Sequence, residues 1–330
     1  MYSLGIETSC DETSCAVVSG QRVRSVVTVS SLNYHKRYGG VIPEIATRNH
    51  LQFIDSVCCQ ALKKARVRLH DISVIAATYR PGLRGALVIG VNFAKALSVS
   101  CKIPFLGVNH LHAHLFSPFL DYPKKIPLPC IGLVVSGGHT DIFLVKDFDD
   151  ITLLGETRDD ACGEVYDKIA RSFGLGYPGG GYIDALYQAQ WADSYRFRCP
   201  RIGLGFSFSG IKTAVIYKKM ELEKAHRLTR DETIKILSSF QESVVTTLVE
   251  NVFAAAAAHK IKTIICGGGV TANLRLRSCL NEKAKETGTR LYVPQKRYTA
   301  DNAAMVAGLA FYLYNDKKNT SSLDLEVETN

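Results

Sequence analysis

The chain of 330 residues has no uninterrupted apolar run long enough to cross a membrane. A transmembrane helix needs about 20 predominantly apolar residues, so we expect a protein without a membrane span. No basic or Ser-rich leader precedes the first apolar segment, residues 2–6. Leaders of that kind direct proteins to export or to organelles, and we therefore expect a cytoplasmic protein.

Paired cysteine motifs are also missing. The ten cysteines include none of the C-x-x-C pairs found in zinc ribbons and redox-active dithiols. Several, such as Cys130 and Cys266, stand inside apolar runs, where cysteine behaves as a small buried hydrophobic residue. We expect reduced, structural cysteines, as is usual in the cytoplasm.

Neither a Walker A loop nor a G-x-G-x-x-G fingerprint occurs in the sequence. Their absence argues against a P-loop NTPase and against an ordinary Rossmann dehydrogenase. Three other glycine-rich turns are present, at residues 136–139, 177–181 and 266–270. Glycine serves ordinary tight turns, but it also lets backbone N–H groups approach a phosphate. Three such turns in one chain favour nucleotide binding.

The charge is unbalanced, with a formal net charge of +9 at pH 7. An excess of this size attracts polyanions such as nucleic acid, although a merely basic protein has the same composition. The basic residues are scattered, with local clusters at residues 63–68 and 218–219. No nucleic-acid-binding module is recognisable, so any such binding would depend on surface shape and charge.

Short β-branched runs alternate with longer segments of helical periodicity, which predicts an α/β protein. We expect strands over residues 3–7, 15–18, 26–30, 74–78, 105–108, 131–135, 141–145 and 263–266. We expect helices over residues 43–64, 83–100, 111–119, 164–173, 183–190, 210–219, 231–259, 274–287 and 301–314.

A weak internal repeat relates residues 4–9 to residues 133–140, because each segment reads as a strand followed by a small polar turn. Two such hairpins predict duplicated lobes with a cleft between them. We expect an N-terminal lobe over residues 1–125, with a helix from about 296–314 packed back on it, and a C-terminal lobe over residues 126–295. The polar, aperiodic residues 315–330 predict a disordered tail.

His110 and His114 are four residues apart, so a helix places both on one face, within reach of one metal ion. A pair of core or surface histidines is the alternative. Leu111 stands where a zinc protease of the H-E-x-x-H type has its glutamate base, which argues against proteolysis. Asp301 is the best third ligand, although a carboxylate at a helix start also serves as an N-cap. Two histidines and one carboxylate leave coordination positions open for substrate.

Further carboxylates lie in the turn at residues 7–13, which includes Asp11 and Glu12. Beside a phosphate-binding hairpin, such groups can orient an attacking group or hold a cation. A polar hairpin loop is the alternative. Asp167 can bind a ribose hydroxyl or can be a solvated helix residue.

Taken together, these segments resemble the TsaD family of tRNA N6-adenosine threonylcarbamoyltransferases, formerly labelled glycoproteases, and its bacterial branch in particular. The matching stretches follow the family's order over nearly the whole chain: GIETSCDET (5–13), YGGVIPEIATRNH (38–50), PGLRGAL (81–87), NHLHAH (109–114), VVSGGHTD (134–141), GEVYDKIAR (163–171), GLGYPGG (174–180), FSFSGIKT (206–213), GGGVTANLRLR (267–277) and DNAAM (301–305).

The resemblance implies the two-lobed fold of actin, sugar kinases and chaperone ATPases (ASKHA), with a nucleotide cleft. It implies transfer of threonylcarbamoyl from threonylcarbamoyl-adenylate to N6 of adenosine 37 in tRNAs that read ANN codons, with release of AMP. The partners it implies are tRNA, an upstream threonylcarbamoyl-adenylate synthase, a TsaB-like paralogue and a TsaE-like ATPase. An ATP-dependent kinase or ATPase on the same fold, and a non-catalytic nucleotide-binding scaffold subunit, are the competing hypotheses.

The resemblance also implies roles for individual residues. It gives one divalent metal, usually Fe²⁺ with Zn²⁺ as the alternative, to His110, His114 and Asp301. It gives the phosphate and carbamoyl region to Val135, Ser136, Gly137, Gly138 and His139, and the nucleotide to Asp167, Gly180, Asp184 and Asn273. Asp11 and Glu12 match polar residues near the reacting end.

Some positions depart from the family's pattern. Arg80 stands where a glycine usually precedes the PGL motif, and Thr299 and Ala300 replace Cys-Thr before Asp301. Neighbours of a metal ligand tune its metal, so the last two can alter metal preference. The expected ligands themselves are all present.

Overall fold

The computed structural model describes residues 1–20, 22–122, 126–200 and 202–329. Its contacts divide the chain into two compact units, Met1–Ile126 together with Pro294–Asn330, and Pro127–Val293. The lobe boundary expected after residue 125 falls at residues 123–125, outside the described residues. The C-terminal part of the chain returns to the first unit.

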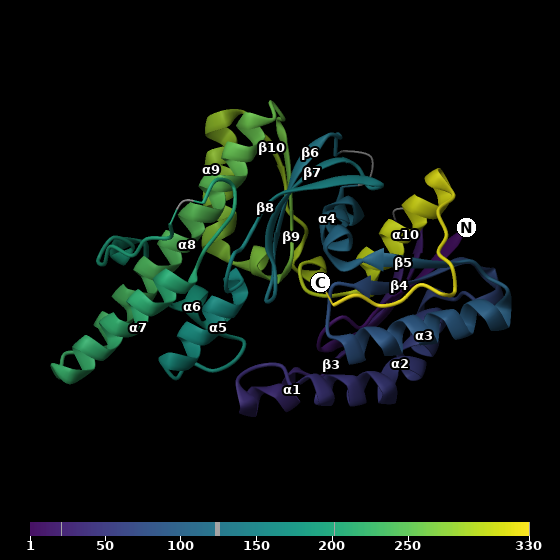
Figure 1. Cartoon of the computed structure of the whole chain (residues 1–330), viewed down its shortest axis with the longest axis horizontal. Helices are drawn as coiled ribbons and strands as arrows, with labels where there is room; N and C mark the ends of the chain where they lie inside the picture. Colours follow the sequence, from purple (N-terminus) through teal and green to yellow (C-terminus); the bar gives the residue numbers. More distant parts are fainter. Residues whose placement is uncertain (21, 123–125, 201, 330) are drawn as a thin grey trace. The chain divides into compact units, whose positions relative to one another are not determined.

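The first unit has a five-stranded sheet in the order β3-β2-β1-β4-β5 (Figure 1). β1, β2 and β3 pair antiparallel, whereas β4 and β5 join in parallel. The strands are β1 (Tyr2–Glu7), β2 (Glu12–Ser19), β3 (Arg22–Ser30), β4 (Ile72–Arg80) and β5 (Phe105–Asn109). The helices are α1 (Leu32–His35), α2 (Pro43–Ala65), α3 (Arg84–Cys101), α4 (His110–Asp121) and α10 (Ala303–Lys317), with 3-10 turns η1 (Lys36–Tyr38), η2 (Leu69–Asp71) and η5 (Lys296–Tyr298).

Helices cover both faces of this sheet, as the alternation along β1 shows. Leu4 and Ile6 pack in a core shared with α2 and α3. Ser3 and Gly5 face α10, because the Ser3 hydroxyl donates to the Ala307 carbonyl at 2.7 Å. A Cβ atom at Gly5 would lie 2.5 Å from the Ala307 nitrogen. The glycine therefore lets the backbone of α10 lie directly on β1.

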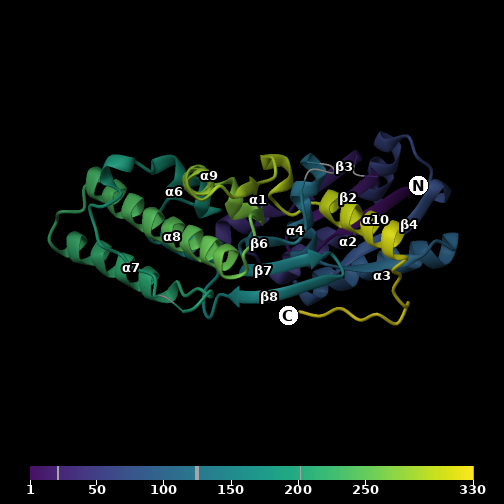
Figure 2. The same cartoon turned by 90° about the horizontal axis from the view of Figure 1, so that it is seen from above.

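The second unit has a sheet in the order β10-β9-β6-β7-β8, of which Figure 2 labels β6, β7 and β8. Its strands are β6 (Cys130–Val135), β7 (Thr140–Asp147), β8 (Asp150–Glu156), β9 (Thr263–Gly267) and β10 (Arg290–Tyr292). Its helices are α5 (Cys162–Ser172), α6 (Gly179–Leu186), α7 (Ser209–Lys224), α8 (Arg230–Ala258) and α9 (Leu274–Thr287), with η3 (Ala189–Trp191) and η4 (Gly269–Ala272). Ile131 and Leu133 of β6 share a buried core with Phe240 and Val244 of α8.

The two sheets have the same topology. In each, three antiparallel strands are followed by two parallel ones, and the first strand of the unit lies at the centre. The prediction of an α/β protein with duplicated lobes is therefore confirmed. The two hairpins that suggested the repeat are β1–β2 and β6–β7.

Several elements differ from the sequence prediction, among them α1, which was not expected, and β8, β10 and α6. β8 and β10 were not expected, because β8 is at a sheet edge with no buried residue and β10 has only 3 residues. α6 begins at Gly179 rather than at Ile183. The glycines indicated a turn, but the Asp167 carboxylate accepts the Gly179 N–H at 2.6 Å and so supports the helix start.

The C-terminal tail also differs from the prediction, which gave it no ordered structure. After α10 it runs along the first unit, where the Ser321 N–H donates to the Phe105 carbonyl at 2.8 Å and the Glu328 N–H donates to the Tyr79 carbonyl at 3.0 Å. Leu325 and Val327 pack against the core of the first unit. Leu323, Leu325 and Val327 alternate with acidic residues, a strand-like period of two that sequence reasoning missed. No helix in the described part of the chain has the length and apolar character of a membrane span.

Candidate metal centre and substrate-binding residues

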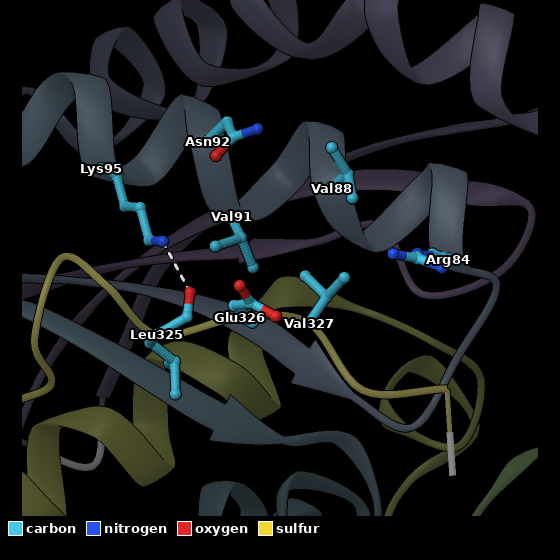
Figure 3. Close-up of a pocket in the computed structure, with 8 residues that line it drawn as sticks. All are labelled: Arg84, Val88, Val91, Asn92, Lys95, Leu325, Glu326 and Val327. Carbon is cyan, nitrogen blue, oxygen red and sulfur yellow. Dashed lines mark hydrogen bonds between the residues drawn. The ribbon is translucent and has the colours of Figure 1, made fainter.

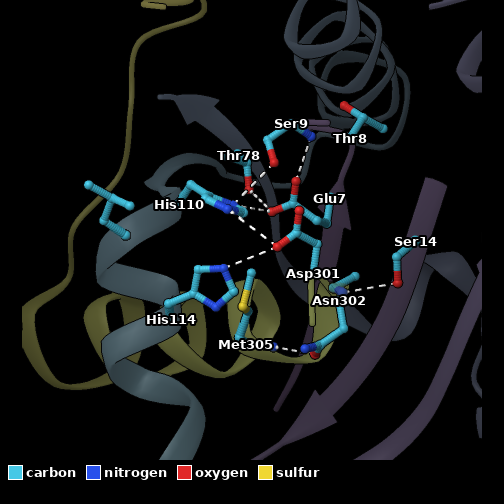
Figure 4. Close-up of polar contacts among 12 residues, drawn as sticks. Glu7, Thr8, Ser9, Ser14, Thr78, His110, His114, Asp301, Asn302 and Met305 are labelled. Carbon is cyan, nitrogen blue, oxygen red and sulfur yellow. Dashed lines mark hydrogen bonds and ion pairs between the residues drawn. The ribbon is translucent and has the colours of Figure 1, made fainter. Parts of the chain in front are cut away.

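Three side chains of the first unit converge where α4 and α10 begin (Figure 4). His110, His114 and Asp301 each offer one ligand atom, and these atoms lie within 4.8 Å of one another. Asn109 caps α4, because its side chain accepts the N–H groups of Leu111 and His112. The helix therefore starts at His110, and its first turn places the His110 and His114 rings on one face.

The carboxylate of Asp301 is directed at both imidazoles. Its Oδ1 atom lies 3.1 Å from Nε2 of His114 and 3.5 Å from Nε2 of His110. The N-cap of α10 is Asn302, whose side chain accepts the N–H groups of Ala304 and Met305. Because Asn302 provides the cap, the alternative role considered for Asp301 is wrong.

A second carboxylate, Glu7 at the end of β1, orients the first imidazole. Its Oε2 atom lies 3.1 Å from Nδ1 of His110 and accepts the Thr78 hydroxyl at 2.6 Å, while Oε1 accepts the Ser9 N–H at 2.6 Å. Glu7 is fully buried. The bond to Nδ1 turns Nε2 of His110 toward Asp301. Sequence reasoning placed Glu7 among the carboxylates of the turn at residues 7–13 but did not assign it to His110, although its position at the end of a buried strand was a usable signal.

The cluster attracts positive charge. Burial disfavours protonation of His110, but the carboxylates of Asp301 and Glu7 outweigh burial and raise the pKa of His110 to about 9. Burial, together with the nearby His110, lowers the pKa of His114. Burial raises the pKa of Glu7, but His110 outweighs it and the net shift is downward.

The residues fit a divalent metal ion. Nδ1 of His114 is buried and has no hydrogen-bond partner among the described residues, while its Nε2 faces Asp301. The His114 side chain is fully buried, whereas that of Asp301 is 20% exposed, which leaves one side of the cluster open. Two imidazoles and a carboxylate suit Fe²⁺ and Zn²⁺, and an open side is typical of catalytic rather than structural sites.

His112 does not belong to the cluster, as its position two residues from each ligand predicted. Burial and the nearby Arg80 lower the pKa of His112 to about 4. It is therefore a neutral imidazole at neutral pH.

Asp11 and Glu12 lie where β2 begins, in the same unit as the three ligands. The Asp11 carbonyl accepts the Ser31 N–H at 2.9 Å, and the Glu12 carboxyl accepts the Ser30 hydroxyl at 3.3 Å. Burial, the Asp11 charge and the Asp301 charge raise the pKa of Glu12 to about 10. This shift favours the protonated form of Glu12, which can donate a hydrogen bond.

The expected phosphate-binding turn joins β6 to β7 in the second unit. The Ser136 N–H donates to the His139 carbonyl at 2.8 Å, and the His139 N–H donates to the Ser136 hydroxyl at 3.1 Å. At Gly137 and Gly138, no heavy atom of the described residues lies within 4 Å of where a Cβ atom would stand. The turn therefore presents open backbone, as an anion-binding turn requires.

The start of α5 packs beneath this turn. A Cβ atom at Gly163 would lie 2.6 Å from the Ser136 carbonyl oxygen, and the Gly163 N–H donates to that oxygen at 3.1 Å. At the end of β9, Gly268 has a φ of 92°, and a Cβ atom there would lie 2.3 Å from the Val135 carbonyl oxygen. Only glycine allows these two approaches.

The other expected nucleotide contacts are linked by polar bonds. Asp167 accepts the N–H groups of Gly179 and Gly180. Asp184 accepts the Gln241 amide at 3.1 Å and the Leu274 N–H at 2.9 Å. Asn273 caps α9, and its amide donates to Gln241 at 3.0 Å. Sequence reasoning missed Gln241, a fully buried residue of α8 that joins Asp184 to Asn273.

The expected residues thus form two groups, one in each unit. The three metal ligands, Asp11 and Glu12 belong to the first unit, and the turn at 135–139 with Asp167, Gly180, Asp184 and Asn273 belongs to the second.

Known proteins of similar fold include HypF from T. kodakarensis, with a TM-score of 0.63 and 14% identity over 96% of this chain and 48% of that chain. Component A of the Acidaminococcus fermentans (R)-2-hydroxyglutaryl-CoA dehydratase has a TM-score of 0.54 and 15% identity over 97% of this chain and 100% of that chain. At such low identity the likeness concerns the fold alone, and it agrees with the expected ASKHA-like architecture.

Sequence relatives are much closer. A protein of Caldicellulosiruptor saccharolyticus is 45% identical over 94% of this chain and 93% of its own length. Proteins of Thermosipho africanus and Protochlamydia amoebophila are 44% and 40% identical, over 98% and 100% of this chain and 96% and 97% of their own lengths. All three are named tRNA N6-adenosine threonylcarbamoyltransferase. The model of the TsaD family, tRNA N6-adenosine threonylcarbamoyltransferase, matches residues 22–308. The chain therefore belongs to the TsaD family.

Proposed function

We propose that this protein transfers the threonylcarbamoyl group from threonylcarbamoyl-adenylate to N6 of adenosine 37 in ANN-decoding tRNAs, and that AMP leaves. The observation that carries this proposal is the convergence of His110, His114 and Asp301, in a chain whose relatives carry the name of this activity. A kinase mechanism provides no role for the two buried histidines.

The first unit holds the reacting end of the donor. His110, His114 and Asp301 would hold one divalent metal ion, with Fe²⁺ expected and Zn²⁺ as the alternative. When bound, this ion would polarise the carbonyl that the amine attacks. Glu7 fixes the tautomer and direction of His110, as carboxylates beside metal-bound histidines do. Asp301, which is 20% exposed, is at the open side where the donor enters.

Glu12 and Asp11 act near the attacked carbonyl. As a neutral acid, Glu12 donates a hydrogen bond to the donor rather than taking a proton from the amine. The donor is an acyl-adenylate whose leaving group is good, so that the main task of the protein is to hold the amine and the carbonyl in reacting geometry.

The second unit holds the AMP part. The open N–H groups of Gly137 and Gly138 stabilise the charge that develops on the phosphate as AMP departs, within the turn formed by residues 135–139. Asp167 and Asp184 already accept backbone bonds, but each carboxylate retains lone pairs for a ribose hydroxyl. Gly180 and Asn273 present backbone and amide groups beside them.

The remaining components are expected from the family. The net charge of +9 suits a tRNA partner. A TsaB-like paralogue, a TsaE-like ATPase and an upstream threonylcarbamoyl-adenylate synthase complete the system, which we assign to the cytoplasm.

The direct test supplies preformed threonylcarbamoyl-adenylate and an unmodified ANN-decoding tRNA, with and without the two partner proteins. Digested nucleosides are read by mass spectrometry, and the same tRNA with guanosine at position 37 is the matched control. Threonylcarbamoyladenosine only from the adenosine tRNA supports the proposal. No product with cognate partners refutes it, and ATP turnover without tRNA would then favour the kinase hypothesis.

A further inference from the structure

The C-terminal tail forms an ion pair at the edge of the candidate site. The Glu328 carboxylate accepts the Arg80 guanidinium at 2.7 Å, and both side chains are partly exposed, at 48% and 39%. The Glu328 N–H is bonded to the Tyr79 carbonyl, so the tail is in register with the end of β4. An acidic side chain of the tail thus neutralises a cation of the first unit.

Arg80 is close to the metal ligands along the sheet. It is the last residue of β4, and its register partner on β5 is Asn109, the residue that caps α4 directly before His110. Its Nε atom is buried and has no hydrogen-bond partner among the described residues. The guanidinium is therefore only partly satisfied by Glu328. Arg80 is also the residue that stands where the family's pattern has glycine.

Two more cations follow Arg80 on one face of α3. Arg84 and Lys95 line a pocket of about 230 Å³ together with Val88, Val91 and the tail residues 325–327 (Figure 3). Lys95 donates to the Leu325 carbonyl at 2.6 Å, and the Glu326 carboxylate lines the same pocket. Within the described chain, neither Arg84 nor Lys95 forms an ion pair with a carboxylate.

We propose that Arg80, with Arg84 and Lys95, is a contact surface for the phosphate backbone of the tRNA substrate, and that the Glu328 carboxylate occupies the place of one phosphate until the tRNA binds. The inference rests on the proposed function. The tail would then compete with the tRNA for Arg80, and Arg80, at which this chain departs from its family's pattern, would bind the tRNA.

The ion pair between Glu328 and Arg80 is weak enough for a tRNA phosphate to replace the Glu328 carboxylate. A partly exposed ion pair contributes little to stability, so the Glu328 side chain can leave Arg80 while Leu325 and the backbone bonds keep the tail in place. A nucleic acid instead gains from the release of counter-ions at several phosphates at once. Arginine also suits this exchange, because its planar guanidinium binds carboxylate and phosphate oxygens in the same geometry.

The test measures the Kd of an unmodified ANN-decoding tRNA transcript by fluorescence anisotropy, without donor, over a range of salt concentrations. We expect Glu328→Gln to tighten binding by up to about fivefold, the effect of losing one exposed ion pair. We expect Arg80→Gln and Arg80→Gly to weaken binding and to lower the salt slope by about one. In the double variant Arg80→Gln/Glu328→Gln, the gain from Glu328→Gln should disappear.

The matched control is Asp324→Asn, which removes the same charge from the same tail at a residue that neither lines the pocket nor touches Arg80. If it tightens binding as much as Glu328→Gln does, or if Glu328→Gln has no effect, the competition is refuted. A gain from Glu328→Gln that persists without Arg80 refutes it too. Saturable binding that is equal in all variants contradicts this inference alone, whereas no saturable binding by any folded variant contradicts the proposed function as well.

Discussion

Nδ1 of His110 lies 3.1 Å from the buried carboxylate of Glu7, at the end of the central strand β1. This contact joins the strand to the first turn of α4 and fixes which nitrogen of His110 faces Asp301. The candidate metal centre is therefore positioned by the sheet of the first unit as well as by the two helix starts.

Glu7→Gln keeps the size of the side chain but removes its charge. We expect the affinity for Fe²⁺ or Zn²⁺ to fall by about 10- to 100-fold, the usual effect of removing a carboxylate that orients a metal-bound histidine. Competition with a chromophoric chelator measures the affinity directly. An unchanged affinity in a folded variant would show that Glu7 does not orient His110.

His114→Ala removes a ligand whose side chain is fully buried. We expect loss of both the bound metal and the transfer activity, while circular dichroism still reports a folded chain. Metal content is read by plasma mass spectrometry. The matched control is His112→Ala in the same helix, which should retain its metal; a His114→Ala protein with full metal content would contradict the ligand assignment.

Gly5→Ala tests the approach of α10 to β1. The added Cβ atom would lie 2.5 Å from the Ala307 nitrogen, so α10 must move, and we expect a loss of about 1–3 kcal/mol or more in the free energy of unfolding. Gly210→Ala in α7 is the control, because no heavy atom of the described residues lies within 4 Å of its Cβ position. Denaturant unfolding of the two variants should differ clearly; equal stabilities would refute the close packing.

Asp141 provides a prediction about pH. Burial and the neighbouring Glu156 raise the pKa of Asp141 to about 7, above its unfolded value of about 3.9. Between these values the folded state binds more protons than the unfolded state, so the free energy of unfolding falls as pH rises.

Asp141→Asn removes this titration. We expect the stability of the variant relative to the wild type to improve by about 2–3 kcal/mol between roughly pH 5 and pH 8. Urea unfolding at both pH values measures the change. A stability difference that stays constant with pH would mean that Asp141 is not a buried, poorly satisfied acid.

Much of this fold was predictable because its central strands are short, apolar and followed by small residues. The strand-and-turn segments at residues 4–9 and 133–140 predicted the duplication. β8 and β10 were not predictable from the sequence, because an edge strand without buried residues has no hydrophobic pattern.

The ligand set was predictable only in part. The spacing of His110 and His114 indicated a shared face, but the role of Asp301 depended on whether Asp301 or Asn302 caps α10. Which of these two adjacent residues caps the helix depends on backbone dihedral angles, which cannot be read from the sequence. The end of a buried strand pointed to Glu7, but its partner His110, like the partners of Gln241 and Arg80, is distant in the sequence, and no local pattern predicts such a contact.

The most direct test of the account is transfer by metal-stripped protein, with preformed threonylcarbamoyl-adenylate and unmodified tRNA. We predict no threonylcarbamoyladenosine from the stripped wild type and recovery in proportion to the Fe²⁺ it rebinds, whereas His114→Ala recovers nothing. Full product formation by a protein shown to contain no metal would contradict the central claim that His110, His114 and Asp301 form the metal centre of the transfer reaction.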